Sequence, residues 1–107
     1  MAPPARLYLV VRADLPPGQQ AVQAAHAMRE FAAHHPETER AWYESSNTLA
    51  LLTVEDEAAL RALLMQAFPK GLKVSPFHEP DRGGEMTAVA FEPGAKKLMR
   101  RLPLALI

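Results

Sequence analysis

The feature that most constrains this chain is an apolar run followed at once by a Pro-Pro-Gly turn and a segment with helical spacing. Residues 7–15 read as a buried strand that runs out into a loop, and residues 16–18 punctuate the start of the helix. A strand that passes through a short turn into a helix is a basic unit of layered α/β folds. We therefore expect a sheet that is covered by helices.

The helix after this turn is expected to have one packing face and one polar face. At about 100° per residue, its polar side chains gather in one wedge, and they are Gln19, Gln23, His26 and Glu30. The residues expected to pack lie around the opposite side: Ala21, Ala24, Ala25, Met28, Phe31 and Ala32. His26 is the candidate for proton transfer in this wedge, because imidazole is the side-chain group that exchanges protons near neutral pH.

The rest of the chain alternates strand patterns with helix patterns. Strands are expected over residues 48–53, 72–77 and 86–91. Helices are expected over residues 37–45, from a cap at Thr53 to Phe68, and around Lys96. This alternation predicts a layered α/β fold in a single domain over residues 1–107.

Size and composition bound the class of protein. The chain has 107 residues, 49% of them hydrophobic, which is enough for one core and too little for two. It has no cysteine, which excludes disulfides and thiol chemistry and fits a reducing cytosol. Its apolar runs are far shorter than the ~20 residues that span a bilayer, and the N-terminus lacks the apolar stretch of a signal peptide. We expect a cytoplasmic protein with no membrane segment.

The charge balance is neutral, with 12 basic and 12 acidic residues, which disfavours a protein that coats nucleic acid. A local cluster of cations nevertheless falls in the last expected helix, at Lys96, Lys97, Arg100 and Arg101. Such a cluster is either a solvated helix face or a patch that contacts phosphate groups. The sequence leaves both interpretations open.

Metal and cofactor chemistry find little support in the sequence. His34, His35 and His78 lack the i, i+4 spacing of a helical zinc pair, so no metal is expected. Neither a glycine loop that cradles phosphates nor a GxSxG nucleophile turn is present, and no cofactor is expected. Trp42 and Tyr43 have faces on which an unpaired base can stack, but Trp42 is expected in the core.

The pattern Val-Arg-x-Asp-Leu, then Gly, then Gln-x-x-His-Ala resembles the signature of the type 2 peptidyl-tRNA hydrolases. The matching positions are Val11, Arg12, Asp14, Leu15, Gly18, Gln23, His26 and Ala27. The family has a lysine directly after the glycine, where this chain has Gln19. The family also has an acidic loop before a threonine that opens the last strand, and Thr87 takes that position. The resemblance is to a short, divergent branch of the family.

The resemblance implies a three-layer α/β/α fold with a four-stranded mixed sheet, and often a homodimer. It implies an esterase that cleaves the bond between tRNA and a peptide or an N-blocked aminoacyl group, without metal or cofactor. The implied catalytic residues are His26, Asp81 and Thr87. The implied substrate-binding residues are Asp14, Gln19, Gln23, Arg12, Glu79 and Arg82.

Several alternatives stay open at this stage. Asp81 is the preferred counterpart of the family's loop aspartate, and Glu79 is the other candidate because this loop is longer. Arg12 or Arg82 is expected to replace the charge lost at Gln19. Two other functions compete with the esterase: a catalytically silent protein that binds a tRNA end or another RNA, and a dimeric regulatory domain. For the latter, the apolar segment 102–107 either docks on a partner or covers the core.

Overall fold

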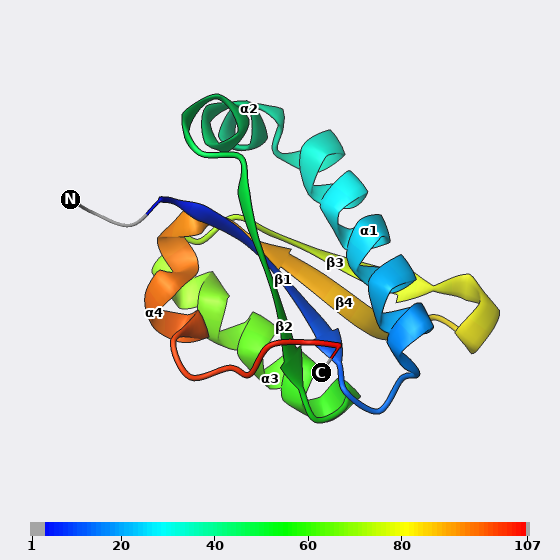
Figure 1. The fold of residues 1–107 in the computed structure, drawn as a ribbon. Coiled ribbons are helices and arrows are strands. Elements are labelled where there is room, and N and C mark those ends of the chain that lie inside the picture. The colour runs from blue at the N-terminus through cyan, green and yellow to red at the C-terminus, as the bar shows by residue number, and fades with distance from the viewer. Residues whose placement is uncertain (1–3, 107) are drawn as a thin grey trace.

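The structure is a computed structural model that describes residues 4–106 (Figure 1). Its strands and helices follow in the order β1 (Arg6–Arg12), α1 (Pro17–His34), α2 (Pro36–Ser45), β2 (Thr48–Val54), α3 (Glu57–Ala67), β3 (Val74–Glu79), β4 (Glu85–Phe91) and α4 (Lys96–Met99). Short 3-10 turns lie at Phe68–Lys70, Pro80–Arg82 and Pro93–Ala95. Each strand and helix expected from the sequence is present, with shifted ends.

The four strands form one mixed sheet in the order β2-β1-β4-β3. β1 pairs with β2 in parallel, and β4 pairs antiparallel with both β1 and β3. The central strands β1 and β4 are buried almost throughout, which explains why their sequences are apolar without strict alternation. The expected α/β fold with a four-stranded mixed sheet is confirmed.

Helices cover both faces of this sheet (Figure 1). On one face, alternate residues of β1 pack under α1 and α2 in a core that includes Phe31 and Trp42. On the other face, the remaining residues of β1 pack with α3 and α4 in a core that includes Leu60 and Met99. The sheet is therefore the middle of three layers. Trp42 is a core residue as expected, and its Nε1 donates to the Thr48 carbonyl at 2.8 Å.

The packing face of α1 differs from the one expected from helical spacing. Its buried residues are Gln20, Gln23, Ala24, Ala27 and Phe31. Ala21 and Ala25, which were expected to pack, are exposed, so that part of the prediction is wrong. Alanine has little apolar surface to gain from burial, whereas both buried glutamines have hydrogen-bond partners inside the protein.

The start of α3 also differs from its prediction. The cap is Asp56, whose Oδ1 accepts from the backbone N–H of Ala59 at 2.9 Å. Thr53, the expected cap, lies inside β2, where its backbone N–H donates to the Pro103 carbonyl at 2.9 Å. β2 therefore extends through Thr53, because a segment near the end of the chain pairs with it there.

That distant segment is the apolar C-terminal stretch. Leu104 lies opposite Leu52 in an antiparallel bridge, and the N–H of Ala105 donates to the Leu51 carbonyl at 3.0 Å. The segment thus covers part of the outer edge of β2, while Leu104 itself stays 60% exposed. Residue 107, the last of the stretch expected to dock or to cover the core, lies outside the described residues.

The connection between β3 and β4 is a tight turn over residues 80–84. Gly83 and Gly84 have φ angles of 66° and 82°, the left-handed region that glycine adopts without strain. The N–H of Gly84 donates to the Glu79 carbonyl at 2.9 Å, so Glu79 and Glu85 lie opposite each other at the strand ends. None of the helices within residues 4–106 is long and apolar enough to cross a membrane.

Candidate functional site

A buried polar pair joins α1 to β4. Gln23 and Thr87 are 1% and 0% exposed, and the Thr87 hydroxyl donates to Gln23 Oε1 at 2.6 Å. Gln23 Nε2 donates to Glu79 Oε1 at 2.9 Å. Because a carboxylate only accepts hydrogen bonds, the Gln23 amide nitrogen must face Glu79 and its oxygen must face Thr87. The three side chains therefore form one directed relay from Thr87 through Gln23 to Glu79.

A β-bulge aims Thr87 at α1. The pairing of β3 with β4 passes from Phe77–Ala88 directly to His78–Met86, so Thr87 is an extra residue without an opposite residue in β3. Ala88 packs in the core under α1, and the bulge turns the adjacent Thr87 toward the same helix. Bulges commonly re-aim a side chain in this way next to functional sites.

His26 lies on the exposed side of α1, one helical turn after Gln23. Its ring stacks on Phe77 of β3 with centroids 4.3 Å apart and planes 7° apart. This flat contact fixes the plane of the imidazole while the side chain remains open to solvent. Phe77 was not among the residues expected at the site, although the sequence places it in an expected strand.

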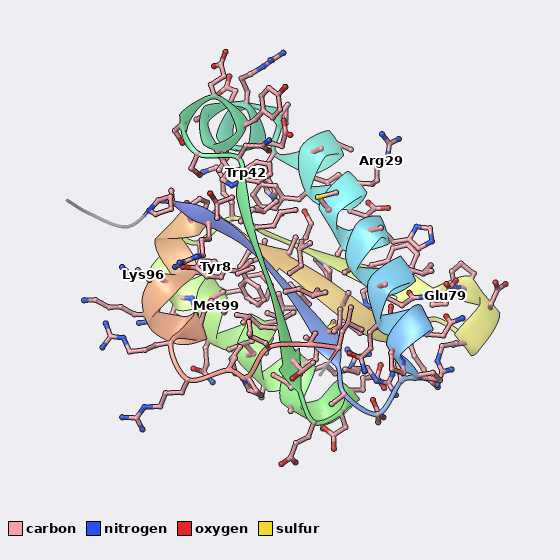
Figure 2. The ribbon with its side chains drawn as sticks, in the orientation of Figure 1. Tyr8, Arg29, Trp42, Glu79, Lys96 and Met99 are labelled. Carbon is pink, nitrogen blue, oxygen red and sulfur yellow. The ribbon has the colours of Figure 1, made fainter. Side chains whose placement is uncertain are left out.

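Glu79 is the carboxylate of this cluster. Its pKa is held below the ordinary value, chiefly by the hydrogen bond from Gln23 and then by the backbone N–H of Asp81 at 3.3 Å. The positive charge of Arg82 acts in the same direction. Glu79 is therefore ionised at neutral pH. Figure 2 shows it at the end of the hairpin that passes beside α1.

Asp81 occupies the turn itself. Its backbone contacts Glu79, and its side chain is exposed in the 3-10 turn Pro80–Arg82. Of the two acidic residues considered for the family's loop aspartate, Glu79 is the one whose carboxylate contacts Gln23. The turn decides which carboxylate reaches Gln23, because it begins after Glu79 and leaves Glu79 at the end of β3, while Asp81 lies within the turn.

A second, charged cluster lies at the end of β1. Arg12 is buried, and its guanidinium makes two 2.9 Å contacts with the Asp14 carboxylate and a 2.8 Å contact with Glu85. The Arg12 hydrogen bond lowers the pKa of Asp14, and the same pair raises the pKa of Arg12. Asp14 thus neutralises the buried charge of Arg12, and the contact of Arg12 with Glu85 ties β1 to β4. Arg82 donates from Nε to Glu85 at 3.3 Å and remains more exposed.

Two further glutamines lie in the first turns of α1. Gln19 is exposed, and its Oε1 is 3.5 Å from Gln23 Nε2. Gln20, which the sequence did not single out, is buried and donates to the Leu15 carbonyl at 2.7 Å, holding the loop before the helix. The i, i+3 spacing of Gln20 and Gln23 places the two side chains near each other on the helix, but it does not show that this side of the helix packs.

The remaining histidines are placed separately. His35 contacts the Val74 carbonyl at 2.9 Å, and His34 lies 3.4 Å from Glu30 on the surface of α1. Within residues 4–106, no three His, Cys, Asp or Glu side chains are grouped so that they could hold a metal ion. The chemistry at this end of the sheet is that of an imidazole, a carboxylate and amide and hydroxyl groups.

These features define an α/β domain in which α1, β3 and β4 bring Gln23, Glu79 and Thr87 into contact, while His26 of α1 stacks on Phe77 of β3. A comparison with protein-family models matches residues 5–105 to peptidyl-tRNA hydrolase PTH2. The chain belongs to the PTH2 peptidyl-tRNA hydrolase family.

The other comparisons bear on the fold. A search of curated proteins gives no significant match. Among the solved structures that match is a protein of unknown function from Agrobacterium tumefaciens strain C58, with 15% identity and a TM-score of 0.67. The match covers 94% of this chain and 97% of that one. At this identity the likeness establishes the three-layer fold and nothing about activity.

Proposed function

We propose that this protein is an esterase that hydrolyses the bond between tRNA and a peptide or an N-blocked aminoacyl group. Membership of the PTH2 family supports the reaction class. The observation that carries the proposal is the directed relay from Thr87 through Gln23 to the ionised Glu79, beside the exposed imidazole of His26. Ester hydrolysis needs an activated water, a stabilised oxyanion and a proton for the leaving sugar hydroxyl, and it requires no metal.

His26 is the proposed general base. An exposed imidazole can take a proton from a water that attacks the ester carbonyl, and it can return the proton to the leaving sugar oxygen. The ring plane is set by Phe77. We assign the Glu79 carboxylate to stabilising the positive charge that develops on the imidazole during the reaction.

Glu79, rather than Asp81, is the proposed carboxylate of the site. Gln23 holds it by a hydrogen bond, and Thr87 in turn sets the orientation of Gln23. Because Gln23 and Thr87 are buried, we assign both to positioning and not to direct contact with substrate. Thr87 is therefore given an indirect role in place of the catalytic one that the family resemblance implied.

The exposed groups around the relay are proposed to contact the substrate. Gln19 offers an amide donor at the N-terminal turn of α1, and Arg82 offers the exposed cation. We assign Arg82 to a phosphate or to the developing oxyanion. Arg12 and Asp14 shape this end of the sheet through their mutual contact and that with Glu85, without facing the substrate themselves.

The same proposal includes the setting of the reaction. One functional domain over residues 1–107 acts on peptidyl-tRNA in the cytoplasm, where it returns tRNA to translation. The neutral net charge fits a protein that recognises one end of a tRNA rather than coating RNA. A homodimer is the expected assembly, and sedimentation of the purified protein at several concentrations tests it.

The direct test is release of peptide from a labelled peptidyl-tRNA by the purified protein. We expect turnover by the wild type and a loss of roughly a hundredfold or more in turnover by His26→Ala, the range for removal of a general base. His34→Ala is the matched control, because His34 is an exposed histidine on the same helix. A folded wild type that releases no peptide, or equal losses in the two variants, would contradict the proposal.

The second candidate is a catalytically silent protein that binds the tRNA end. The observation in its favour is Gln19, an uncharged residue where the family has lysine. The peptide-release assay, combined with tRNA binding measured at several salt concentrations, separates the two functions. Salt-sensitive binding to tRNA without peptide release would select the silent protein.

A further inference from the structure

A pocket of about 600 Å³ lies at the outer edge of β2. Its walls come from the start of β1, from β2, from α4 and from the C-terminal segment. β2 and β3 are the two opposite edges of the sheet, so this pocket is on the other side of the molecule from Glu79. In Figure 2 the labels of Tyr8, Lys96 and Met99 mark the α4 side, far from Glu79. The volume lies within the ~300–1,000 Å³ typical of small-molecule sites.

Part of the pocket lining is apolar and open to water. Leu49 of β2 and Leu104 of the C-terminal segment are 48% and 60% exposed, and both line the pocket. Tyr8, Met99 and Leu102 continue this surface toward the core. A ligand with an apolar portion would remove these side chains from water, which is favourable in proportion to the apolar area covered.

The pocket also carries three cations, Arg6, Lys96 and Arg100. Lys96 and Arg100 are four residues apart at α4 and therefore lie on the same side, where like charges repel. The described lining contains no aspartate or glutamate, and none of the ion pairs among residues 4–106 involves these cations. An anion between them would relieve the repulsion.

We propose that this pocket binds a small amphiphile, an anionic carboxylate or phosphate head group on an apolar chain. The head group lies between Arg6, Lys96 and Arg100, and the chain covers Leu49 and Leu104. A nucleic-acid phosphate would match the cations but leave the leucines exposed, and a neutral apolar ligand would do the reverse. The site lies apart from the proposed esterase centre, so binding here is a separate property of the protein.

The test is a titration of the full chain followed by NMR of its leucine and methionine methyl groups. The probes are octanoate and octyl phosphate, with octanol and inorganic phosphate as matched probes that lack one half of the amphiphile. We expect saturable shifts at Leu49, Leu104 and Met99 with at least one of the two amphiphiles, and binding about tenfold weaker for each half-probe. The stronger of the two amphiphiles identifies the head group.

Three outcomes of this titration would overturn the proposal. The first is the absence of shifts at Leu49 and Leu104 with either amphiphile. The second is equal binding of octanol, which would remove the role of the cations, and the third is equal binding of inorganic phosphate, which would remove that of the apolar chain. A separate titration with a short RNA duplex gives a further check. If the duplex shifts the same methyl groups at lower concentrations than either amphiphile, the pocket is a nucleic-acid site and the proposal is overturned.

Neighbouring cations supply matched variants. Arg100 lines the pocket, whereas Arg101, the next residue, is exposed and does not. We expect Arg100→Glu to weaken binding of the preferred amphiphile about tenfold and Arg101→Glu to weaken it less than about twofold. Equal weakening by both would show a diffuse surface charge effect and overturn the proposed site. The methyl spectra of the free variants report whether each one is folded.

Discussion

At the scale of single residues, the relay is a polar structure inside an apolar layer. The Thr87 hydroxyl and the two ends of the Gln23 amide are each matched with a partner, which is what makes their burial tolerable. Removing one partner leaves a buried polar atom without a hydrogen bond, at a cost of about 1–3 kcal/mol. The relay is thus sensitive to small chemical changes that hardly alter shape.

Thr87→Val is the variant that tests this sensitivity, because it removes the hydroxyl while keeping the branched shape. We expect the free energy of unfolding to fall by about 1–3 kcal/mol and kcat to fall about tenfold or more, because Gln23 no longer holds Glu79 in one orientation. Denaturant unfolding and peptide release measure the two effects. Thr87→Ser keeps the hydroxyl and should recover most of the activity. Failure of this rescue would argue against a role through the hydrogen bond.

Gln19→Lys restores the cation that the family has at this position. We expect kcat/KM on peptidyl-tRNA to rise about tenfold, because a charged donor stabilises a phosphate or an oxyanion better than an amide does. Gln19→Met is the control, since it keeps the length of the side chain without charge or donor, and its kcat/KM should not rise. A lysine variant no faster than the wild type would show that Arg82 already supplies the cation.

Only part of the site could be predicted from the sequence. Helical spacing places Gln19, Gln23 and His26 near one another, because neighbours on a helix follow from the periodicity alone. The burial of Gln23 could not be predicted, since its partner Thr87 lies 64 residues away and is aimed by a bulge. The position of Glu79 likewise depends on pairing between strands, which the spacing of acidic residues in a loop does not reveal.

At the scale of elements, the turn between β3 and β4 positions the carboxylate. Gly84 has a φ of 82°, and its N–H closes the turn onto the Glu79 carbonyl. A residue with a Cβ is strained in this backbone conformation. The turn thus depends on glycine for its shape, and the site depends on the turn.

Gly84→Ala and Gly71→Ala form a matched pair for this dependence. Both glycines have positive φ, and a Cβ at either position would meet no atom within 4 Å, so any cost comes from the backbone. We expect each variant to lose about 1–2 kcal/mol of unfolding free energy. Activity should fall about tenfold only in Gly84→Ala, because Gly71 follows α3 and lies outside the turn that holds Glu79. Equal activity in the two variants would contradict a positioning role for the turn.

The order of the elements was predictable and their ends were not. Short apolar runs identify the strands, and apolar residues at helical spacing identify the helices, because both patterns depend only on neighbouring residues in the sequence. The end of β2 depends instead on Pro103 and Ala105, which pair with its outer edge from the far end of the chain. For the same reason the cap of α3 is Asp56 and not Thr53.

At the scale of the whole molecule, the Arg12 cluster ties the end of β1 to the start of β4. The guanidinium is buried and contacts both Asp14 and Glu85. Its contact lowers the pKa of Asp14 in the folded protein. Asp14 therefore contributes stability above its unfolded-state pKa of about 3.9 and loses that contribution as pH falls through the lower folded value.

Asp14→Asn tests this contribution to acid stability. At pH 7 we expect a loss of about 0.5–1 kcal/mol of unfolding free energy, a modest amount because the Asp14 side chain is 42% exposed. The difference between the variant and the wild type should shrink as the pH falls below about 4. Denaturant unfolding across this range measures it. A difference that stays constant down to acid pH would contradict the linkage.

The position of β4 has a consequence for the folding of the protein during its synthesis. It is the last of the four strands in the chain, yet it lies between β1 and β3, and β3 pairs with no other described strand. During synthesis the middle of the sheet is therefore filled last, and Thr87 reaches Gln23 only in that step. A growing chain is itself a peptidyl-tRNA. We therefore expect the proposed esterase to be inactive until synthesis has passed β4.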